Sequence, residues 1–325
     1  MFGVYSRFFK GTNLMGNEFD LSIIIVNWNT KELLLDCLAS VYETVKRISM
    51  EVWLVDNAST DGSVEAAKGF YPGVKIIQNT ENIGFAAANN RAFKRMCGRY
   101  AVLLNTDAVL TEGAIEAIYD FMENTPDAGM ACGQLLNPDG SKQNSIANFP
   151  GLPSLLLNET LLRILLPKRY PSKRKEYKDP IEVDSCIGAC LMVRKATMDH
   201  VGFLDEDYFF FFEETDWARR IKQSGWKIYF IPFARIVHFQ GRSVGHDIKS
   251  RILYYTSRYT YFKKWHPHHY LLIRRIIFIR LLFNAVLNFA GVIGTLNLQK
   301  NVKKRFVLYT QLIRWHLQGC PETFN

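Results

Sequence analysis

The sequence lacks the cysteine patterns that build disulfide frameworks or zinc sites. Its six cysteines are scattered along 325 residues, with no C-x-x-C pair and no histidines at zinc-ligand spacing. We therefore expect reduced thiols, as in a cytosolic protein. Residues 1–20 also lack an apolar stretch long enough for a signal peptide, so secretion is not expected. We interpret these residues as a poorly ordered leader, with Phe2, Phe8 and Phe9 available for membrane contact.

Two common nucleotide-binding loops are also absent from the sequence. No G-x-G-x-x-G follows the first apolar strand pattern, which disfavours a dehydrogenase-type dinucleotide site. No G-x-x-x-x-G-K-[ST] motif is present, which argues against a P-loop. A nucleotide bound by this protein must therefore be held in another way.

Acidic residues are almost absent from the C-terminal end. From Ser250 to Asn325 the sequence has twelve Lys and Arg but one acidic residue, Glu322, whereas the rest of the chain has 28 basic and 30 acidic residues. The net charge of +9 therefore arises in the tail. Because the cations alternate with aliphatic runs instead of lining a polar groove, we do not expect nucleic acid as a partner.

The same tail contains an uncharged stretch, Leu281–Gln299, which approaches the roughly 20 residues that span a bilayer. Asn284, Asn288, Gly291 and Thr295 fall on one helical face, and basic residues flank the stretch on both sides. We therefore expect residues 246–325 to form helices that attach to a membrane surface without crossing it. The alternative is a soluble helical pair packed on the rest of the protein or on a second copy of it.

Alternating strand and helix patterns fill the first part of the chain. Apolar runs typical of buried strands occur at Leu21–Trp28, Glu51–Val55, Val74–Gln78 and Ala101–Leu110, and a helical pattern begins near Thr30. This alternation predicts an α/β fold whose mostly parallel sheet is flanked by helices. An irregular middle segment follows. It has an apolar patch, Leu152–Leu166, and a basic run, Lys168–Lys178, which we interpret as a solvated loop.

The apolar run at Ala101–Leu110 ends abruptly in a polar tripeptide, Asn105-Thr106-Asp107, which indicates a buried strand whose last residues reach the carboxyl edge of a sheet. Open α/β sheets bind ligands at the carboxyl ends of their strands. Because side chains alternate along a strand, Asn105 and Asp107 are expected to leave the sheet on the same side, where they could hold a divalent cation. The alternative is a strand that simply ends in an Asx-turn.

Three carboxylates, Glu213, Glu214 and Asp216, directly follow the aromatic run Tyr208–Phe212. Placing them together is costly unless a positive charge or a proton lies among them, which is typical of a catalytic group. The alternative is a helix start, where acidic side chains complement the helix dipole. Further along, His238 follows a predicted strand, and it could be either structural or part of a site.

Four segments, SIIIVNWN, WLVDNASTDGS, NIGFAAANN and LLNTDA, resemble the nucleotide-sugar half of the family 2 glycosyltransferases, and the rhamnosyltransferase-like branch in particular. The resemblance implies a GT-A fold. It places a glycosyltransferase domain at residues 21–245, with the nucleotide-sugar half at 21–110 and the acceptor and catalytic half at 111–245. Residues 246–325 are then a membrane-associating tail.

The resemblance also implies a donor site. The nucleobase and ribose would be held by Val26, Asn27 and Asp56. The family's D-x-D motif, which coordinates Mg²⁺ or Mn²⁺ on the sugar diphosphate, corresponds to the Asn105–Asp107 tripeptide, with Asp107 as its charged ligand and His238 facing the metal or diphosphate. The full set of implied donor-binding residues is Val26, Asn27, Asn29, Asp56, Asn57, Ser59, Asn82, Gly84, Asn90, Asn105, Thr106, Gly188, Ala189 and Arg219.

The segment EETDWARR, followed by Gly225-Trp226, is similar to the family's E-D-x-D...R...G-W element, which carries the catalytic base. Glu214 occupies the base position and is our first candidate, with Glu213 and Asp216 as alternatives. The family's activity implies an inverting transfer to a lipid-linked or polysaccharide acceptor in cell-surface glycan synthesis. Together with the composition of the tail, this activity implies a peripheral or monotopic protein at the cytoplasmic face of the membrane. The oligomeric state is left open, with a homo-oligomer as one alternative.

The branch resemblance favours L-rhamnose from dTDP-rhamnose as the donor. UDP-galactofuranose, UDP-glucose or UDP-N-acetylglucosamine would use the same parts. Two departures from the family pattern, Asn105 in the first D-x-D position and Glu214 for the usual Asp, favour an alternative of another class, a catalytically silent nucleotide-sugar-binding scaffold.

Overall fold

The computed structural model describes residues 19–167, 169–171, 175–241, 247–295 and 298–321. The expected leader lies outside these residues, apart from Phe19 and Asp20, which already belong to the first strand. Residues 168 and 172–174 of the expected basic loop are also outside the described part of the chain.

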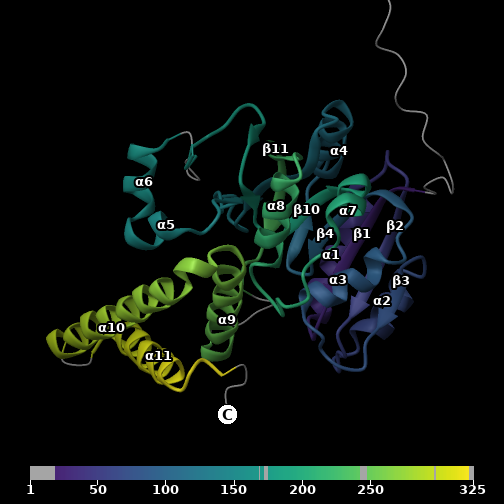
Figure 1. Ribbon diagram of the computed structural model, residues 1–325. Helices are drawn as coiled ribbons and strands as arrows, with labels where there is room; N and C mark the ends of the chain where they lie inside the picture. The colour runs from purple at the N-terminus through teal and green to yellow at the C-terminus, as the bar shows by residue number, and fades with distance from the viewer. Residues whose placement is uncertain (1–18, 168, 172–174, 242–246, 296–297, 322–325) are drawn as a thin grey trace, which may run out of the picture.

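A mixed sheet forms the centre of the protein (Figure 1). Its strand order is β3-β2-β1-β4-β10-β6-β11-β5, and β8 pairs with β11 beside this path. The sheet strands are β1 (Phe19–Asn27), β2 (Met50–Asp56), β3 (Lys75–Gln78), β4 (Gly98–Asn105), β5 (Ala108–Leu110), β6 (Ala128–Leu136), β8 (Ile181–Glu182), β10 (Cys190–Arg194) and β11 (Lys227–His238). A separate two-stranded sheet pairs β7 (Ile146–Ala147) with β9 (Ser185–Cys186).

The strands β3, β2, β1 and β4 run parallel, as the βαβ alternation predicts. β1 is apolar almost throughout because both faces of the sheet are covered by helices. One face packs against α1 (Lys31–Thr44), α2 (Ser63–Phe70) and α4 (Ala114–Asn124). The other packs against α3 (Phe85–Phe93), α7 (Lys195–Val201) and α8 (Glu213–Gln223). The expected α/β fold is confirmed.

The apolar strand ends at the polar tripeptide, as the sequence predicted, and a second short strand follows it. β4 ends at Asn105 in the middle of the sheet, and β5 then pairs antiparallel with β11 at the far edge. The chain crosses between these two positions at Thr106 and Asp107. The break has a physical cause, because both side chains contact other segments at the carboxyl ends of the strands instead of continuing the pleat.

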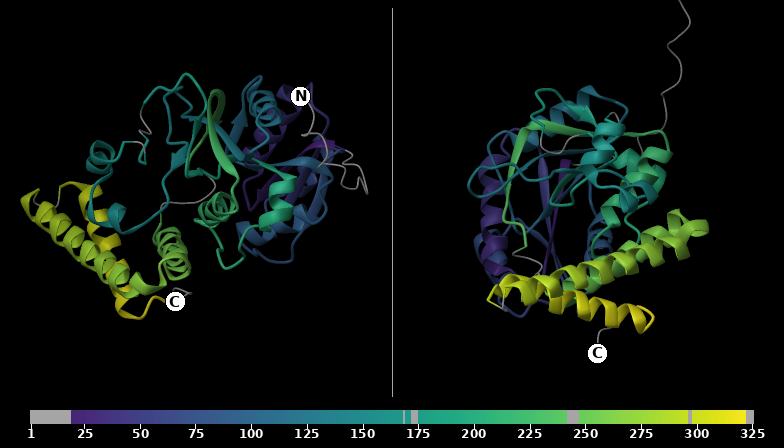
Figure 2. Two further views of the ribbon diagram at one scale, coloured as in Figure 1. Left: turned by 45° about the horizontal axis from the view of Figure 1, so that its top comes forward. Right: turned by 90° about the vertical axis from the view of Figure 1, so that its left-hand side faces the viewer.

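The C-terminal helices and part of the middle segment form a hydrophobic core of their own beside the α/β domain, in addition to the two on the faces of the sheet (Figure 2). Its buried members include Leu155, Tyr261, Phe262, Ile277 and Trp315. The helix at Ile248–Trp265 is rich in aromatic residues and contacts the catalytic half, where Ser257 donates to the carbonyl of Phe210 at 2.7 Å. The helices of this region are α5 (Leu152–Leu156), α6 (Glu159–Leu165), α9 (Ile248–Trp265), the 3-10 turn η1 (Pro267–His269), α10 (Tyr270–Gly294) and α11 (Lys300–Leu317).

Candidate active site

The carboxyl ends of β1 and β2 bring three of the expected donor-binding residues together. Asn27 and Asp56 are register partners in neighbouring parallel strands, and both are buried. The Asn27 side chain donates to Asp56 Oδ1 at 3.0 Å and to Ser59 Oγ at 3.0 Å. The backbone N–H of Ser59 donates to the other Asp56 oxygen at 2.9 Å. The carboxylate is therefore held in one orientation at the sheet edge.

The loops that follow these two strands brace each other. The N–H of Asn29 donates to Ser59 Oγ at 2.9 Å, and its side-chain oxygen accepts from the N–H of Thr60 at 2.7 Å. Asn29 and Ala58 have positive φ angles of 53° and 62°, which cost energy in residues other than glycine. Backbone strain of this kind persists where the surrounding structure enforces it, and it clusters at ligand sites. Val26, which directly precedes Asn27, is the register partner of Asn105 in β4.

The loop before α3 is fixed against the aromatic segment that precedes α8. Asn57 donates to Asn82 Oδ1 and to the Gly84 carbonyl, both at 3.2 Å. Gly84 has a φ of +84°, and a Cβ atom there would lie 2.6 Å from the carbonyl oxygen of Phe209. Only glycine allows this close approach. Asn57, Asn82 and Gly84 thus connect the donor loops to the segment that carries the candidate base.

Asn90 lies elsewhere than expected. Its amide donates to the carbonyl of Leu204 at 2.8 Å and accepts from the N–H of Leu204 at 3.1 Å. This two-way pairing fastens α3 to the loop after α7. Asn90 therefore supports the wall of the site, which differs from the donor contact that the sequence resemblance implied.

The break between β4 and β5 places Asp107 against His238. His238 ends β11 and pairs with Ala108, so the histidine ring lies beside the residue before Ala108. The distance from Asp107 Oδ1 to His238 Nε2 is 3.4 Å, and both side chains are buried. The two residues are 131 positions apart in the sequence, and the structure brings them together as expected.

Gln143, which the sequence analysis did not single out, fixes the histidine ring. The Gln143 amide nitrogen donates to the His238 carbonyl at 2.6 Å and to Asn137 Oδ1 at 2.7 Å. The amide oxygen is therefore the atom that faces His238 Nδ1, at 2.9 Å. This orientation requires a proton on Nδ1, which leaves Nε2 as the atom directed at Asp107. Nothing in the local sequence marks Gln143, because its role depends on a contact 95 residues away.

The Asp107–His238 pair has the spacing of two ligands on one cation. Ligand atoms about 2.1 Å from a divalent ion, at angles near 90° to 110°, lie roughly 3.0 to 3.4 Å apart. A neutral imidazole nitrogen and a carboxylate oxygen are both suitable donors. Among the described residues no group of three or more His, Cys, Asp or Glu side chains could hold a metal, so a cation bound here would need further oxygens from a substrate.

The other two residues of the tripeptide have different surroundings. Thr106 is buried, and its hydroxyl forms a 3.0 Å hydrogen bond with the hydroxyl of Thr30. Thr106 therefore joins the ends of β1 and β4. Asn105 is partly exposed, and its backbone N–H donates to the carbonyl of Ala189 at 3.0 Å. The Asn105 side chain is thus the accessible member of the tripeptide.

The candidate base lies on the strained first turn of α8. Phe211 and Phe212 have positive φ angles of 70° and 69°, in a region that bulky side chains rarely adopt. Glu214 follows, and it is partly exposed, with its pKa raised by burial. A Cβ atom on Gly188 would lie 3.6 Å from Glu214 Cγ. Gly188 and Ala189 therefore lie between Glu214 and the Asn105–Asp107 corner.

Glu213 is more deeply buried than Glu214. Its side chain is 4% exposed, and Oε2 has no hydrogen-bond partner in the described part of the chain. Burial, followed by the nearby charge of Glu214, raises the pKa of Glu213 well above its ordinary value. A neutral Glu213 is thus favoured beside an ionised Glu214.

Asp216 and Arg219 face the C-terminal helices instead of the donor loops. Asp216 is fully buried, and its oxygens accept from Arg220 at 3.0 Å, Lys264 at 2.9 Å and Trp265 Nε1 at 2.7 Å. The Arg219 guanidinium lies 4.5 Å from the Trp265 ring and donates to Tyr261 OH at 2.9 Å. Both residues therefore fasten α8 to α9. This placement differs from the catalytic and donor-binding roles considered for them.

The burial of Glu213 predicts a pH-dependent gain in stability for Glu213→Gln. Because burial raises the pKa of Glu213 in the folded protein, the unfolded chain releases this proton at a lower pH than the folded chain does. The free energy of unfolding of the wild type therefore falls as the pH rises above the ordinary pKa of glutamate. Glutamine carries no such proton. Relative to the wild type, the variant should gain on the order of 1–3 kcal/mol between pH 5 and pH 8.

Thermal unfolding followed by circular dichroism at several pH values measures this difference. The matched control is Glu81→Gln, because Glu81 is exposed to water in the folded protein. We expect the control to unfold with the wild type at every pH. A Glu213→Gln variant that lost stability toward pH 8 would contradict the assignment of a buried, protonated Glu213.

Similar proteins and solved structures indicate the family and the fold of the chain. The model of the family described as Glycosyl transferase family 2 matches residues 22–202. An N-acetylglucosaminyl-diphospho-decaprenol L-rhamnosyltransferase of Mycobacterium tuberculosis is 30% identical over 250 residues, which cover 71% of this chain and 80% of the relative. The low-salt glycan biosynthesis hexosyltransferase Agl10 of Haloferax volcanii is 26% identical, with 63% of this chain and 62% of the relative covered.

Among solved structures, the mannosyltransferase PcManGT from Pyrobaculum calidifontis in complex with GDP-Man and Mn²⁺ aligns with a TM-score of 0.56. The sequences are 17% identical, and the alignment covers 94% of this chain and 88% of the other. GalNAc-T7 with UDP, GalNAc and Mn²⁺ aligns with a TM-score of 0.52, also at 17% identity, over 76% of this chain and 50% of the other. At this identity the likeness concerns the fold.

Proposed function

Because the chain belongs to glycosyl transferase family 2, we propose that it moves a sugar, with L-rhamnose from dTDP-rhamnose as the first candidate, from a nucleotide-diphosphate donor to a lipid-linked or polysaccharide acceptor by an inverting reaction. The chain is a glycosyltransferase with a GT-A-like fold and an apolar C-terminal helix. The donor, the acceptor and the stereochemistry are the parts that we propose.

One observation carries the proposal. Glu214 lies against Gly188, and the neighbouring Ala189 carbonyl accepts from the N–H of Asn105 in the corner that also contains Asp107 and His238. A candidate base and a candidate metal-diphosphate corner therefore lie on either side of one short backbone segment. A donor sugar between them would have its diphosphate at Asp107 and its anomeric carbon toward Glu214.

In the proposed mechanism, ionised Glu214 accepts the proton of the acceptor hydroxyl. The hydroxyl oxygen then forms a bond to the anomeric carbon, on the face opposite the diphosphate, as the bond from that carbon to the diphosphate oxygen breaks. Asn27, Asp56 and Ser59 would hold the nucleoside part, and Asp107 and His238 would hold Mg²⁺ or Mn²⁺. When bound, the cation offsets negative charge on the leaving diphosphate.

One relative and the C-terminal tail of this chain support the proposed class of acceptor, a lipid-linked one. The Mycobacterium tuberculosis protein is named for an acceptor with a lipid diphosphate, N-acetylglucosaminyl-diphospho-decaprenol. In this chain, Pro267–Gly294 is long and apolar enough, by length and composition, to cross a membrane. We propose that the helices hold the protein at the cytoplasmic face of the membrane as a peripheral or monotopic protein, where a lipid-linked acceptor is within reach.

A thermal-shift screen tests donor binding. The full-length protein is heated with dTDP-, UDP- and GDP-sugars, each with and without Mn²⁺ or Mg²⁺. A ligand present at 100 times its dissociation constant should stabilise the fold by about 2.7 kcal/mol. We expect dTDP-rhamnose with metal to give the largest shift, and a larger shift with a UDP-sugar would reassign the donor. Failure of every nucleotide sugar to stabilise the protein would refute the proposed function.

A second candidate is a catalytically silent nucleotide-sugar-binding scaffold. The observation that favours it is Asn105, whose amide replaces the first carboxylate of the D-x-D motif. A silent scaffold would be stabilised by the donor but would release no nucleoside diphosphate from it. Turnover therefore separates the two candidates where binding alone does not.

A further inference from the structure

The short helices α5 and α6 expose a dense group of apolar side chains. Leu155 and Leu162 are buried and anchor the two helices. Six large apolar side chains in these helices or directly after them are exposed by 37% to 71% of their area, and they are Leu156, Leu157, Leu161, Ile164, Leu165 and Leu166. Exposed apolar groups in such density mark interaction sites, whereas scattered single ones do not.

The outer face of α10 has the same character. Ile273, Ile277, Leu281 and Ala285 recur every four residues and face the core. The opposite side exposes Ile279, Leu282, Phe283, Val286, Leu287 and Ile293, each by 40% or more. The expected polar or small face of this helix is only partly exposed, and its residues are Asn284, Asn288, Gly291 and Thr295. A Cβ atom on Gly291 would lie 3.0 Å from Val302, so this row turns toward α11.

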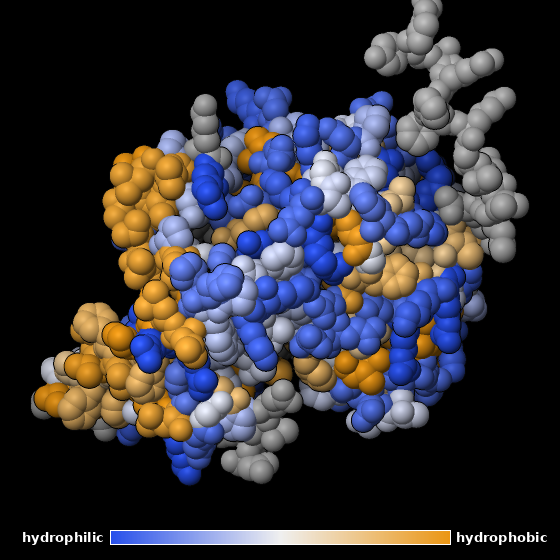
Figure 3. Space-filling view, in the orientation of Figure 1, coloured by the Kyte–Doolittle hydropathy of each residue, from blue (hydrophilic) through white to orange (hydrophobic). Residues whose placement is uncertain are grey.

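These two apolar faces are joined to each other. Arg280 of α10 donates to the carbonyl of Leu155 in α5 at 2.7 Å, and Leu155 lies in the same core as Ile277 and Leu281. Figure 3 shows the apolar side chains along one edge of the molecule, from α6 through α5 to α10. We call this surface, formed by α5, α6 and the outer side of α10, the apolar edge.

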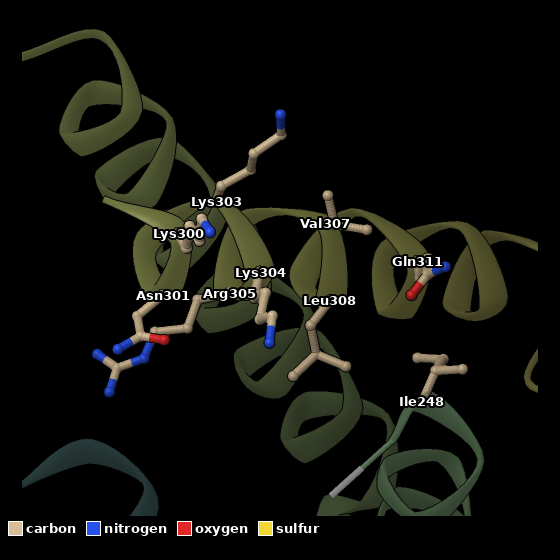
Figure 4. Close-up of a pocket in the computed structure, with 9 residues that line it drawn as sticks. All are labelled: Ile248, Lys300, Asn301, Lys303, Lys304, Arg305, Val307, Leu308 and Gln311. Carbon is tan, nitrogen blue, oxygen red and sulfur yellow. The ribbon is translucent and has the colours of Figure 1, made fainter. Parts of the chain in front are cut away.

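A basic groove opens at the start of α11, the helix packed against α10. Its cavity of about 900 Å³ has Lys300, Lys303, Lys304 and Arg305 in its lining, and none of the described residues that line it is acidic. In Figure 4, Lys304 and Leu308 extend toward the side on which Ile248 lies, whereas Lys303 points away. Cationic groups around an apolar floor are complementary to a phosphate headgroup whose acyl chains continue into a bilayer.

We propose that the apolar edge and the basic groove together dock the protein on a membrane leaflet that contains anionic lipids, with headgroup phosphates in the groove. α5 and α6, more than eighty residues before the tail in the sequence, are thus part of the membrane-binding surface. The inference deepens the proposed function, because a lipid-linked acceptor would reach the enzyme from this leaflet.

Charge favours a membrane over a second copy of the chain as the occupant. The tail has twelve basic residues and one acidic residue from Ser250 onward. In a symmetric dimer the same patch meets itself, so pairing through this surface would bring the two basic tails together. An anionic leaflet instead attracts each of these cations.

Vesicle flotation with the full-length protein tests the proposal. We expect strong binding to phosphatidylcholine vesicles that contain phosphatidylglycerol, and weaker binding to phosphatidylcholine alone. Lys304→Glu/Arg305→Glu should reduce the partition coefficient on anionic vesicles by at least about ten-fold and should have a smaller effect on neutral ones. Ile164→Glu/Leu165→Glu in α6 should reduce binding to both kinds of vesicle.

Two controls make matching changes elsewhere. Lys94→Glu/Arg95→Glu changes the net charge by the same amount as the α11 variant, at two exposed residues that directly follow α3. Phe70→Glu introduces a charge at an exposed apolar residue of α2. Both should float like the wild type. Donor-induced thermal shifts, measured in parallel, show whether each variant is folded and whether the proposed function itself fails.

Three results would overturn the proposal. The first is wild-type binding by the α6 variant, and the second is an equal loss for the Lys94→Glu/Arg95→Glu control. The third is a wild-type dimer in light scattering that becomes monomeric in the α6 variant without any change in flotation, because this would assign the apolar edge to a second copy.

Discussion

Replacing Glu214 with Gln is expected to lower the rate of sugar transfer by about 10²- to 10⁴-fold and to leave donor binding intact. Glutamine keeps the size and most hydrogen bonds of the side chain but cannot accept the acceptor proton. Single-turnover release of nucleoside diphosphate measures the chemical step, and the donor-induced thermal shift measures binding. Near-normal transfer by the folded variant would show that Glu214 is not the base.

Two further variants assign the base among the clustered carboxylates. Glu214→Asp keeps the charge but withdraws it by about 1.5 Å, the length of one carbon–carbon bond. A displacement of this size can cost about 100-fold in rate. Glu213→Gln should retain most of the transfer rate, because Glu213 is already held protonated by burial. If Glu213→Gln and not Glu214→Gln abolished transfer, the two roles would be exchanged.

The pH dependence of wild-type transfer also tests whether Glu214 is the base. Glu214 must be ionised to act as a base, and burial raises its pKa above the ordinary glutamate value of 4.5. The acidic limb of kcat/KM should therefore lie above pH 4.5, with activity rising as pH increases through the raised pKa.

Asp107→Asn is expected to remove most of the metal-dependent transfer, by about 100-fold or more, because it deletes the negative charge of the two proposed ligands, Asp107 and His238. Binding of Mn²⁺, followed by its electron paramagnetic resonance signal with and without donor, provides a readout separate from activity. For the wild type we expect weak Mn²⁺ binding alone and much tighter binding with the donor, since the diphosphate supplies further oxygens. Equal Mn²⁺ affinity with and without the donor would contradict the hypothesis that the diphosphate completes the metal site.

Neighbouring residues provide graded comparisons for Asp107. Asn105→Asp restores the second carboxylate of a D-x-D motif, and it should tighten Mn²⁺ binding in the absence of donor. Gln143→Leu removes the group that orients His238, and loss of the hydrogen bond that holds a metal-binding histidine typically reduces metal affinity by about 10- to 100-fold. If Gln143→Leu left Mn²⁺ affinity unchanged in the presence of donor, His238 would not be a ligand.

Much of the fold could be predicted from the sequence because its signals are local. The β-branched run of β1 and the polar residues at the ends of β1 and β2 indicate a parallel sheet with a ligand edge. The meeting of Asp107 and His238 followed from the family resemblance, since no local pattern links residues 131 positions apart. The end of the strand at the polar tripeptide was also predicted, but no local pattern indicates that Ala108–Leu110 forms a separate strand paired with β11.

The remaining differences arise from tertiary contacts. Asp216 and Arg219 are part of the catalytic-base motif in the sequence, but the aromatic residues of α9 and Lys264 take up their polar groups. Asn90 binds the backbone of Leu204 for a similar reason. The polar row of α10 faces α11 because Gly291 allows close packing there. Each outcome depends on a partner that is distant in the sequence.

The most direct test of the account is nuclear magnetic resonance analysis of the product anomeric centre. The full-length protein is incubated with Mn²⁺, a lipid-linked acceptor and the nucleotide sugar that stabilises it most. We expect nucleoside diphosphate and a new glycoside in equal amounts, with an anomeric configuration opposite to that of the donor. A donor that binds but stays unconverted, or a product with retained configuration, would contradict an inverting transfer through Glu214.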